Sequence, residues 1–190
     1  MMDLKKVEAG VKLMLEGIGE DLNRPGIART PERVANSMAE LCRGLEPGAR
    51  KPMTVMRELD QNEMIIVKDI SFSSMCEHHL LPFLGRCDVV YLPADDRIAG
   101  LSSIVELVEH LAARPTIQER LTTEIANTLM EELQAKGVMV VMEAEHMCLA
   151  MRGVKKRDSR IVTSAMRGYL KRPETRSEAL SLIGRSIQGR

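Results

Sequence analysis

The stretch that decides the fold is Val138-Met139-Val140-Val141-Met142-Glu143-Ala144. A short apolar run of this kind, bounded by turn residues, is suited to a buried β-strand. Residues 161–164, Ile-Val-Thr-Ser, predict its partner strand further along the chain. Upstream, Met-Ile-Ile-Val at 64–67 and Cys-Asp-Val-Val-Tyr-Leu at 87–92 have the same character. These runs predict the strands of the folded core.

Helical patterns fill the sequence between these strands. One helix is predicted at about 102–113, Arg114-Pro115 interrupts it, and a second helix follows to about Lys136. A final helix is predicted to start at Pro173. The core order is therefore strand, strand, helix, helix, strand, strand.

The first part of the chain is predicted to be helical. Residues 3–17 carry apolar side chains at helical spacing, and Gly17 and Gly19 close the segment. Thr30-Pro31-Glu32 then opens a second helix, with Thr30 as the N-cap, which runs to about Gly44. Near Met64 the pattern changes from helical spacing to the apolar runs that predict strands.

Composition narrows the class of protein. A chain of 190 residues is the size of one ordinary domain, and because aromatics make up only 2%, methionine, leucine, isoleucine and valine must fill the core. Lys+Arg and Asp+Glu balance at 27 each, so no net field favours nucleic acid or acidic lipid, and self-association is permitted. We find no signal peptide and no membrane span, and we expect a cytoplasmic protein.

Two short clusters hold most of the reactive side chains. Cys76-Glu77-His78-His79 comes just after a predicted strand, and His146-Met147-Cys148 ends another. Cysteines of a cytosolic protein are more often thiols or metal ligands than disulfides, and zinc favours thiolate and imidazole ligands. With Cys76, His79 and Cys148 as the ligands of a zinc ion, one coordination position stays open, and His78 and His146 are left for proton transfer at neutral pH.

Other interpretations of these clusters stay open. The two clusters could form a closed structural zinc site of the Cys2His2 type. Cys76 could instead be a nucleophile, although this leaves Cys148 without a role. Outside the clusters, Cys42 and Cys87 are expected to be small core residues, and His110 is expected to be a packed or surface histidine.

Four ordered segments resemble the GTP cyclohydrolase I family. The first is Ser-Met-Cys-Glu-His-His-Leu-Leu-Pro-Phe at 74–83, which is similar to the signature segment of that family. The others are Gly-Leu-Ser at 100–102, Arg-Pro-Thr-Ile-Gln-Glu-Arg-Leu-Thr at 114–122 and Glu-His-Met-Cys-Leu-Ala-Met-Arg-Gly at 145–153. The likeness extends from about Thr30 to the helix around Thr175.

The resemblance implies a fold and an assembly. The fold is the α+β tunnelling fold, in which an antiparallel sheet carries two helices on one face. Sheets of neighbouring subunits join into a barrel, and two pentamer rings stack into a homodecamer with active sites at the subunit interfaces. In this chain the resemblance implies a helical N-terminal region at 1–60 and a tunnelling-fold catalytic domain at 61–190.

The resemblance also implies a reaction. A water activated by Zn²⁺ attacks C8 of the guanine of GTP, the imidazole ring opens, and formate leaves. The ribose then rearranges to give 7,8-dihydroneopterin triphosphate, the first step of folate and pterin biosynthesis. Cys76, His79 and Cys148 would bind the zinc, and His78 and His146 would be the catalytic acid and base. The implied substrate-binding residues are Glu119 at the guanine N–H edge, Gln118 beside it, Ser102, Arg152, and Arg33 from a neighbouring subunit.

The sequence departs from the family pattern at the phosphate end. The family usually has Lys directly after Gly-Leu-Ser and Arg three positions later, whereas this chain has Ser103 and Glu106. The basic segment 155–160 could replace the missing charge, or the substrate could be a guanine nucleotide or nucleoside with fewer phosphates. Further alternatives are a divergent paralogue, a non-catalytic zinc-stabilised oligomer that binds a purine or pterin, and a nitrile reductase of the same fold with Cys76 as nucleophile.

Overall fold

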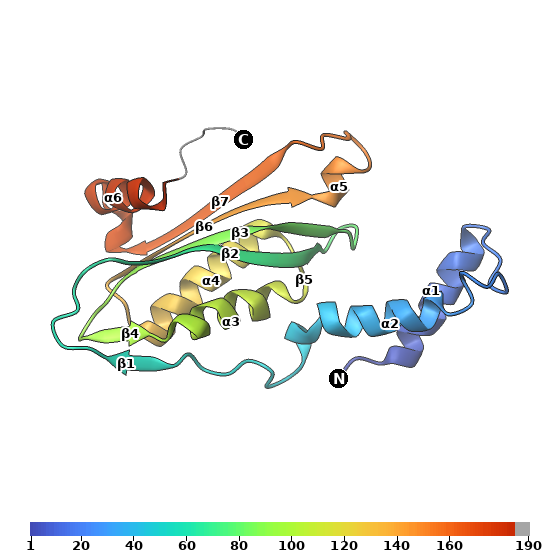
Figure 1. Cartoon of the computed structure of the whole chain (residues 1–190), viewed down its shortest axis with the longest axis horizontal. Helices are drawn as coiled ribbons and strands as arrows, with labels where there is room; N and C mark the ends of the chain where they lie inside the picture. The colour runs from blue at the N-terminus through green and yellow to red at the C-terminus, as the bar shows by residue number, and fades with distance from the viewer. Residues whose placement is uncertain (185–190) are drawn as a thin grey trace.

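A five-stranded sheet forms the centre of the computed structural model, which describes residues 1–184 (Figure 1). The strand order is β5-β2-β3-β6-β7. Neighbouring strands from β2 to β7 are antiparallel, whereas the short β5 runs parallel to β2. The strands are β2 (Ile65–Cys76), β3 (Pro82–Leu92), β5 (Pro115–Thr116), β6 (Gly137–His146) and β7 (Arg160–Gly168).

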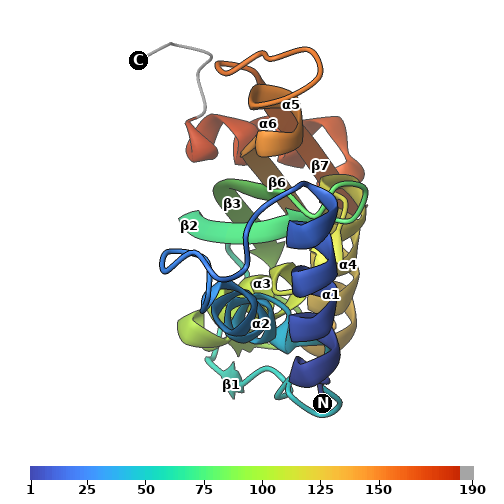
Figure 2. The same ribbon diagram turned by 90° about the vertical axis from the view of Figure 1, so that its right-hand side faces the viewer.

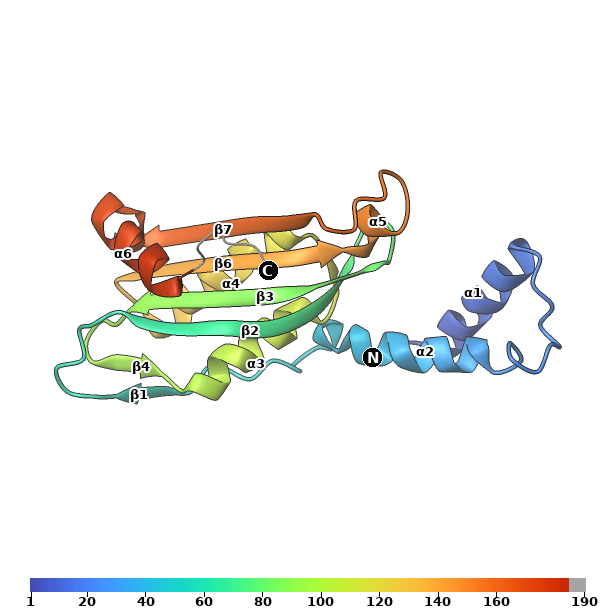
Figure 3. The ribbon, with the colours of Figure 1, turned by 45° about the horizontal axis from the view of Figure 1, so that its top comes forward.

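Helices cover the two faces of the sheet unequally. α3 (Leu101–Ala112) and α4 (Gln118–Leu133) lie along one face, and α6 (Pro173–Ile183) covers one end of the other (Figures 1 and 3). The period of two in a strand explains both contacts, because successive side chains point to opposite faces. Val140 and Met142 of β6 pack with the α3–α4 side, whereas Met139 and Val141 pack with α6.

The long helix α4 shows why this sequence forms its larger core. Leu121, Ile125, Leu129 and Leu133 recur every four residues and are all buried. Side chains at this spacing share one face of a helix, and here that face meets the sheet. Burying each leucine or isoleucine is worth about 1.5–3 kcal/mol, so this stripe sets how α4 lies on the sheet.

The N-terminal helices extend away from the sheet. α1 (Leu4–Gly17) packs against α2 (Thr30–Leu41), as the view along this end shows (Figure 2), and the short 3₁₀-helix η1 (Arg43–Leu45) follows. Several of their large apolar side chains are exposed, including Leu13, Met14 and Ile18. The expected N-cap is wrong, because Thr30 is already helical and Arg29 occupies the capping position without a side-chain hydrogen bond.

The predicted order of strands and helices is confirmed, and three short strands are added to it. β1 (Val55–Arg57) and β4 (Arg97–Ala99) pair as a separate two-stranded sheet, so the predicted helical region 1–60 also contains a strand. The predicted break at Arg114-Pro115 becomes β5. The structure is thus an α+β fold, and the joining of sheets between subunits stays a prediction. Across residues 1–184, no helix has the length and apolarity that crossing a membrane requires.

Gly85 of β3 allows β6 to approach closely. It pairs with Ala144, and a Cβ added there would lie against the Glu143 carbonyl oxygen and 2.7 Å from the Ala144 Cα. We expect Gly85→Ala to lower the free energy of unfolding by about 3 kcal/mol or more, because backbone on both sides would have to move. The measurement is urea unfolding followed by circular dichroism.

Gly10→Ala is the matched control for this change. Gly10 lies in α1 with nothing within 4 Å of an added Cβ, so we expect a gain of about 0.5–1 kcal/mol from helix propensity. Equal effects of the two substitutions would contradict the close β3–β6 approach.

Candidate metal site and its surroundings

The loop between β2 and β3 brings His79 back toward Cys76. Cys76 ends β2, its N–H donates to the Leu81 carbonyl at 2.8 Å, and the Leu80 N–H donates to the Cys76 carbonyl at 2.8 Å. Leu80 has a φ of 52°, the left-handed conformation that closes such a tight loop. Two backbone hydrogen bonds therefore hold the Cys-x-x-His segment in a closed turn.

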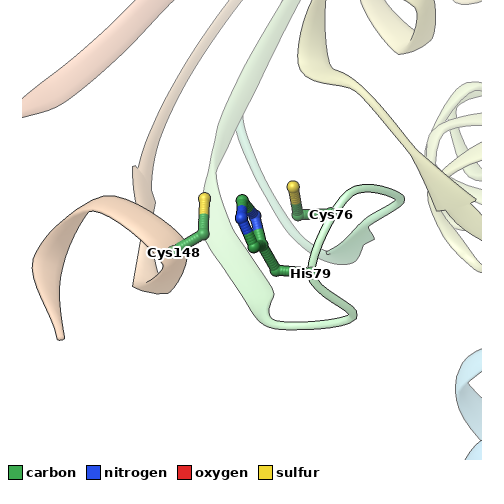
Figure 4. Close-up of side chains that lie close together, drawn as sticks. All are labelled: Cys76, His79 and Cys148. Atoms are coloured by element: carbon green, nitrogen blue, oxygen red, sulfur yellow. The ribbon is translucent and has the colours of Figure 1, made fainter. Parts of the chain in front are cut away.

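The third side chain of the predicted metal site, Cys148, comes from the short helix that follows β6. β6 ends at His146, which pairs with Phe83 of β3, and the short helix α5 (Met147–Ala150) carries Cys148. The prediction that Cys148 ends a strand is thus wrong, because Cys148 lies in the helix that follows the strand. The turn into α5 points the Cys148 side chain toward the β2–β3 loop (Figure 4).

Cys76, His79 and Cys148 form one group that could hold a metal ion. One ligand atom from each lies within 4.8 Å of the others. Cys76 is buried, Cys148 is half-buried and His79 is exposed, so the group opens to solvent on the histidine side. Within residues 1–184, the group contains no fourth His, Cys or carboxylate. This favours the three-ligand site with an open position over the closed Cys2His2 site.

The chemistry of the donors fits a borderline-soft divalent cation. Burial raises the pKa of the Cys148 thiol, and the neighbouring Cys76 raises it further. Burial and the neighbouring sulfur thus disfavour the Cys148 thiolate, and a bound metal removes that obstacle because it deprotonates its thiol ligands. Two thiolates and one imidazole are ligands that zinc prefers.

His78 lies beside this group without belonging to it. Its ring stands edge-on to that of His79, with centroids 6.3 Å apart and an interplanar angle of 80°. The His78 Nδ1 atom is 4.0 Å from the Cys76 sulfur, and the side chain is exposed. His78 can therefore exchange protons with solvent or ligand next to the metal position.

An ion pair ties the same loop to α4. The Arg120 guanidinium donates to both carboxylate oxygens of Glu77, and this hydrogen bonding holds the pKa of Glu77 below its usual range. The Glu77 N–H also donates to the Thr116 carbonyl of β5 at 3.1 Å. Because both ions are largely solvated, we expect the pair to orient the loop more than to stabilise the fold.

His146 is held more firmly than His78. Its ring stacks on Phe83, with centroids 4.6 Å apart and an interplanar angle of 4°. Its Nε2 atom lies 2.8 Å from Oε1 of Gln118. Burial lowers the pKa of the His146 imidazole, while the Glu119 carboxylate acts in the opposite direction. On balance the pKa of His146 lies below its ordinary value, which favours the neutral imidazole that can accept a proton.

The predicted substrate-binding residues divide into two sets. Arg152 lies at the metal group, with its Nη1 atom 3.3 Å from His79 Nε2, and the charge of Glu119 raises the pKa of the neighbouring His146. Gln118 is also adjacent, but it is only 1% exposed and its amide is engaged inside the protein. Its predicted contact with substrate stays a prediction.

Ser102 and Arg33 lie elsewhere in the chain. Ser102 is exposed at the start of α3, directly after β4, whereas the metal group lies at the other end of β3 (Figure 1). Eleven residues of strand separate these ends, which is about 35 Å at 3.3 Å per residue. Arg33 is exposed on α2, in the helical pair that extends from the sheet.

The remaining cysteines and histidine match their expected roles. Cys42 and Cys87 are buried, with 3% and 0% exposure, and neither belongs to the metal group. His110 is half-buried on α3 and is likewise outside the group.

Comparison with known proteins identifies the family. The family model described as GTP cyclohydrolase I matches residues 7–184. The chain belongs to the GTP cyclohydrolase I family. The resemblance inferred from the sequence motifs is thereby confirmed.

Curated members of the GTP cyclohydrolase I family match this chain over nearly their whole length. GTP cyclohydrolase 1 of Lysinibacillus sphaericus (strain C3-41) is 50% identical over 183 residues, covering 96% of this chain and 97% of the relative. The protein of the same name from Carboxydothermus hydrogenoformans is 48% identical over 185 residues, covering 97% and 96%. The one from Bifidobacterium longum (strain NCC 2705) is 49% identical over 181 residues, covering 95% and 91%.

A fainter likeness in shape appears among solved structures. The crystal structure of the archaeosine synthase QueF-Like in the apo form aligns with a TM-score of 0.45 and 12% identity. The alignment covers 58% of this chain and 97% of that chain.

Removing one thiol of the metal group tests its ligand role. We expect Cys148→Ala to lower the affinity for a divalent transition metal by at least about 100-fold, since the change leaves only two protein ligands. Metal content after dialysis, measured by atomic emission, gives the result. Cys42→Ala, a buried cysteine outside the group, should keep the metal of the unchanged protein. Equal metal content in both variants would refute the assignment.

Proposed function

We propose that this chain hydrolyses the guanine imidazole ring of GTP, releases C8 as formate, and rearranges the product to 7,8-dihydroneopterin triphosphate, the first step of folate and pterin biosynthesis. One observation carries the proposal: the Cys76, His79 and Cys148 group lies beside two further imidazoles, His78 and His146. The curated relatives named GTP cyclohydrolase 1, at about half identity over nearly the whole chain, support it.

The metal in this proposal is Zn²⁺, held by Cys76, His79 and Cys148. Zinc with three protein ligands supplies Lewis acidity and makes a water molecule acidic enough to react near neutral pH. The thiolate ligands need a reducing compartment, which supports a cytoplasmic location.

His78 and His146 are the proposed acid and base. Opening the guanine ring requires a proton to leave the attacking water and another to reach a purine nitrogen, and imidazole can do both near pH 7. The exposed His78 suits exchange with solvent, and the neutral His146 suits accepting a proton. Glu119, close to His146, is the proposed acceptor for the guanine N–H edge, since a carboxylate accepts two such hydrogen bonds.

We further propose that neighbouring subunits complete the site, in a homodecamer of two pentamers. Arg152 beside His79 can meet substrate within one chain. Ser102 lies about 35 Å of strand away from the metal end of the sheet, and Arg33 is on the extended helical pair. Ser102 therefore reaches a substrate at the metal only from another copy of the chain, and we propose that Arg33 does the same.

We make a second, narrower proposal about the part of the site that would bind the phosphates of the substrate. This chain depends less on a triphosphate than the family usually does. Ser103 is 8% exposed and its Oγ accepts a hydrogen bond from the Thr54 N–H at 3.0 Å, so it is a structural contact. Glu106 is exposed and brings a negative charge. Where the family usually has two cations, this chain has an uncharged and an acidic side chain, and the basic segment 155–160 is the alternative source of positive charge.

Formate release tests the main proposal. We expect the zinc-loaded protein to release formate from GTP and to give the fluorescence of an oxidised pterin. His78→Asn should keep its zinc but lose turnover by roughly 100-fold or more, because general acid–base catalysis is removed. His110→Asn, a change at a histidine outside the group, serves as the control and should keep both properties.

Two outcomes would overturn parts of this proposal. Loss of zinc in His78→Asn would make His78 a ligand. Zinc binding and purine binding without formate release would favour the non-catalytic oligomer, and a thioimide adduct on Cys76 with a nitrile substrate would favour the nitrile reductase.

Comparison of substrates tests the phosphate proposal. We expect kcat/KM for GTP to exceed that for GMP by less than about tenfold, because two charge-assisted hydrogen bonds, each worth about 1.5–3 kcal/mol, are missing. Glu106→Arg should raise the preference for GTP by about tenfold or more, whereas the same change at Glu109, one turn further along α3, should not. A preference above about 100-fold in the unchanged protein would defeat the proposal.

A further inference from the structure

Gln118 is a buried polar residue with an unusual number of partners. It is the first residue of α4, directly after the short strand β5, and it is 1% exposed. A buried amide must find hydrogen bonds inside the protein, since leaving it unpaired costs several kcal/mol. Its partners lie on β6, on β7 and on His146.

The orientation of the Gln118 amide is fixed by its surroundings. Its Nε2 atom donates to the carbonyl oxygens of Met142 at 3.1 Å and Ile161 at 3.0 Å. Main-chain carbonyls only accept hydrogen bonds, so the reverse orientation would place the amide oxygen against two acceptors. The NH2 group must therefore face the strands, and Oε1 must face His146.

A closed ring of hydrogen bonds supports this orientation. Gln118 Nε2 also lies 3.1 Å from Thr163 Oγ1, which is 2.6 Å from Thr122 Oγ1. The Thr122 hydroxyl donates to the Gln118 main-chain carbonyl at 2.7 Å. With its proton so used, Thr122 accepts from Thr163, and Thr163 Oγ1 is a third acceptor that shares the two amide hydrogens with the two carbonyls. The ring leaves the amide oxygen as the one group of this side chain aimed at His146.

The orientation of the Gln118 amide determines which ring nitrogen of His146 carries a hydrogen. An amide oxygen only accepts, so the His146 Nε2 atom at 2.8 Å must carry a hydrogen. Stacking on Phe83 fixes the plane of the ring, and a half-turn that keeps this plane would place a C–H group, not Nδ1, against the amide oxygen. We propose that Gln118 is a positioning residue: its amide oxygen holds the hydrogen of His146 on Nε2 and leaves Nδ1 as the nitrogen available for proton transfer.

This inference deepens the proposed function and gives Gln118 a role other than the substrate contact expected from its sequence. The tautomer is a property of the folded protein and does not depend on turnover. Only the kinetic consequence rests on the proposed function. A tautomer held by a second residue is a recurrent requirement for a histidine that acts as a base.

Nitrogen NMR of the zinc-loaded full-length chain, labelled with ¹⁵N-histidine, tests the tautomer directly. At alkaline pH, where imidazole is neutral, we expect the His146 Nε2 signal at the position of a protonated nitrogen and Nδ1 at that of a bare one. His146→Asn assigns the signals by removing them. The opposite pattern, or an equal mixture, would overturn the inference whatever the activity of the protein.

Gln118→Met tests the kinetic consequence. It keeps length and volume but removes the amide, so His146 should become a mixture of tautomers. We expect kcat for formate release to fall roughly 100-fold, with KM within about twofold because no substrate contact is removed. Zinc content should not change.

Thr163→Val is the matched control. It removes one partner of the amide but keeps both carbonyl acceptors and the Oε1–His146 contact, so the tautomer and kcat should stay near those of the unchanged protein. An unaltered kcat in Gln118→Met would overturn the positioning role. If the unchanged protein shows the Nε2–H tautomer but releases no formate, the proposed function fails and the tautomer assignment stands.

Discussion

The antiparallel pairing of β3 with β6 is the constraint on which the site depends. In this register Phe83 faces His146, which places the end of the Cys-x-x-His loop next to the start of α5. A slip of one residue would turn every side chain of a strand to the other face of the sheet. It would exchange the side chains that pack on the α3–α4 side with those that pack on the α6 side, separate His146 from Phe83, and move Cys148 away from Cys76. The absence of a side chain at Gly85 lets the two strands approach at this register.

Packing and chemistry meet at the end of this pair of strands. Inside the sheet, both faces of β6 are covered, so Gly137 to Met142 are all buried. Toward His146 the cover ends and the strand becomes half-buried. Reactive side chains are therefore held by a rigid sheet but lie where solvent and a ligand can reach them, which a site with an open metal position requires. Gln118 continues the buried side of the arrangement, because it bridges β6 and β7 beneath His146.

The sequence allowed the element order and the metal group to be predicted, because apolar runs and the Cys/His clusters are local signals. The length of β2 was missed for a physical reason. A bulge between Val67 and Ile70 shifts its register, with Asp69 at a φ of 58°, and beyond it polar and apolar residues alternate, since one face is solvated. The position of Gln118 was missed because a polar triplet at the start of a helix is ordinarily exposed. Its burial follows from long-range contacts with β6 and β7, which no local pattern encodes.

The distance between the two ends of β3 bears on whether a single chain can bind the whole substrate. The metal group lies at one end of β3 and the start of α3 lies at the other, with about 35 Å of strand between them. A nucleoside triphosphate is much shorter than that, so a single chain cannot use both ends for one substrate molecule. The exposed apolar side chains of the extended helical pair, Leu13, Met14 and Ile18, favour burial against another chain. If Ser102 touches a substrate bound at the metal group, the contact therefore comes from another copy of the chain.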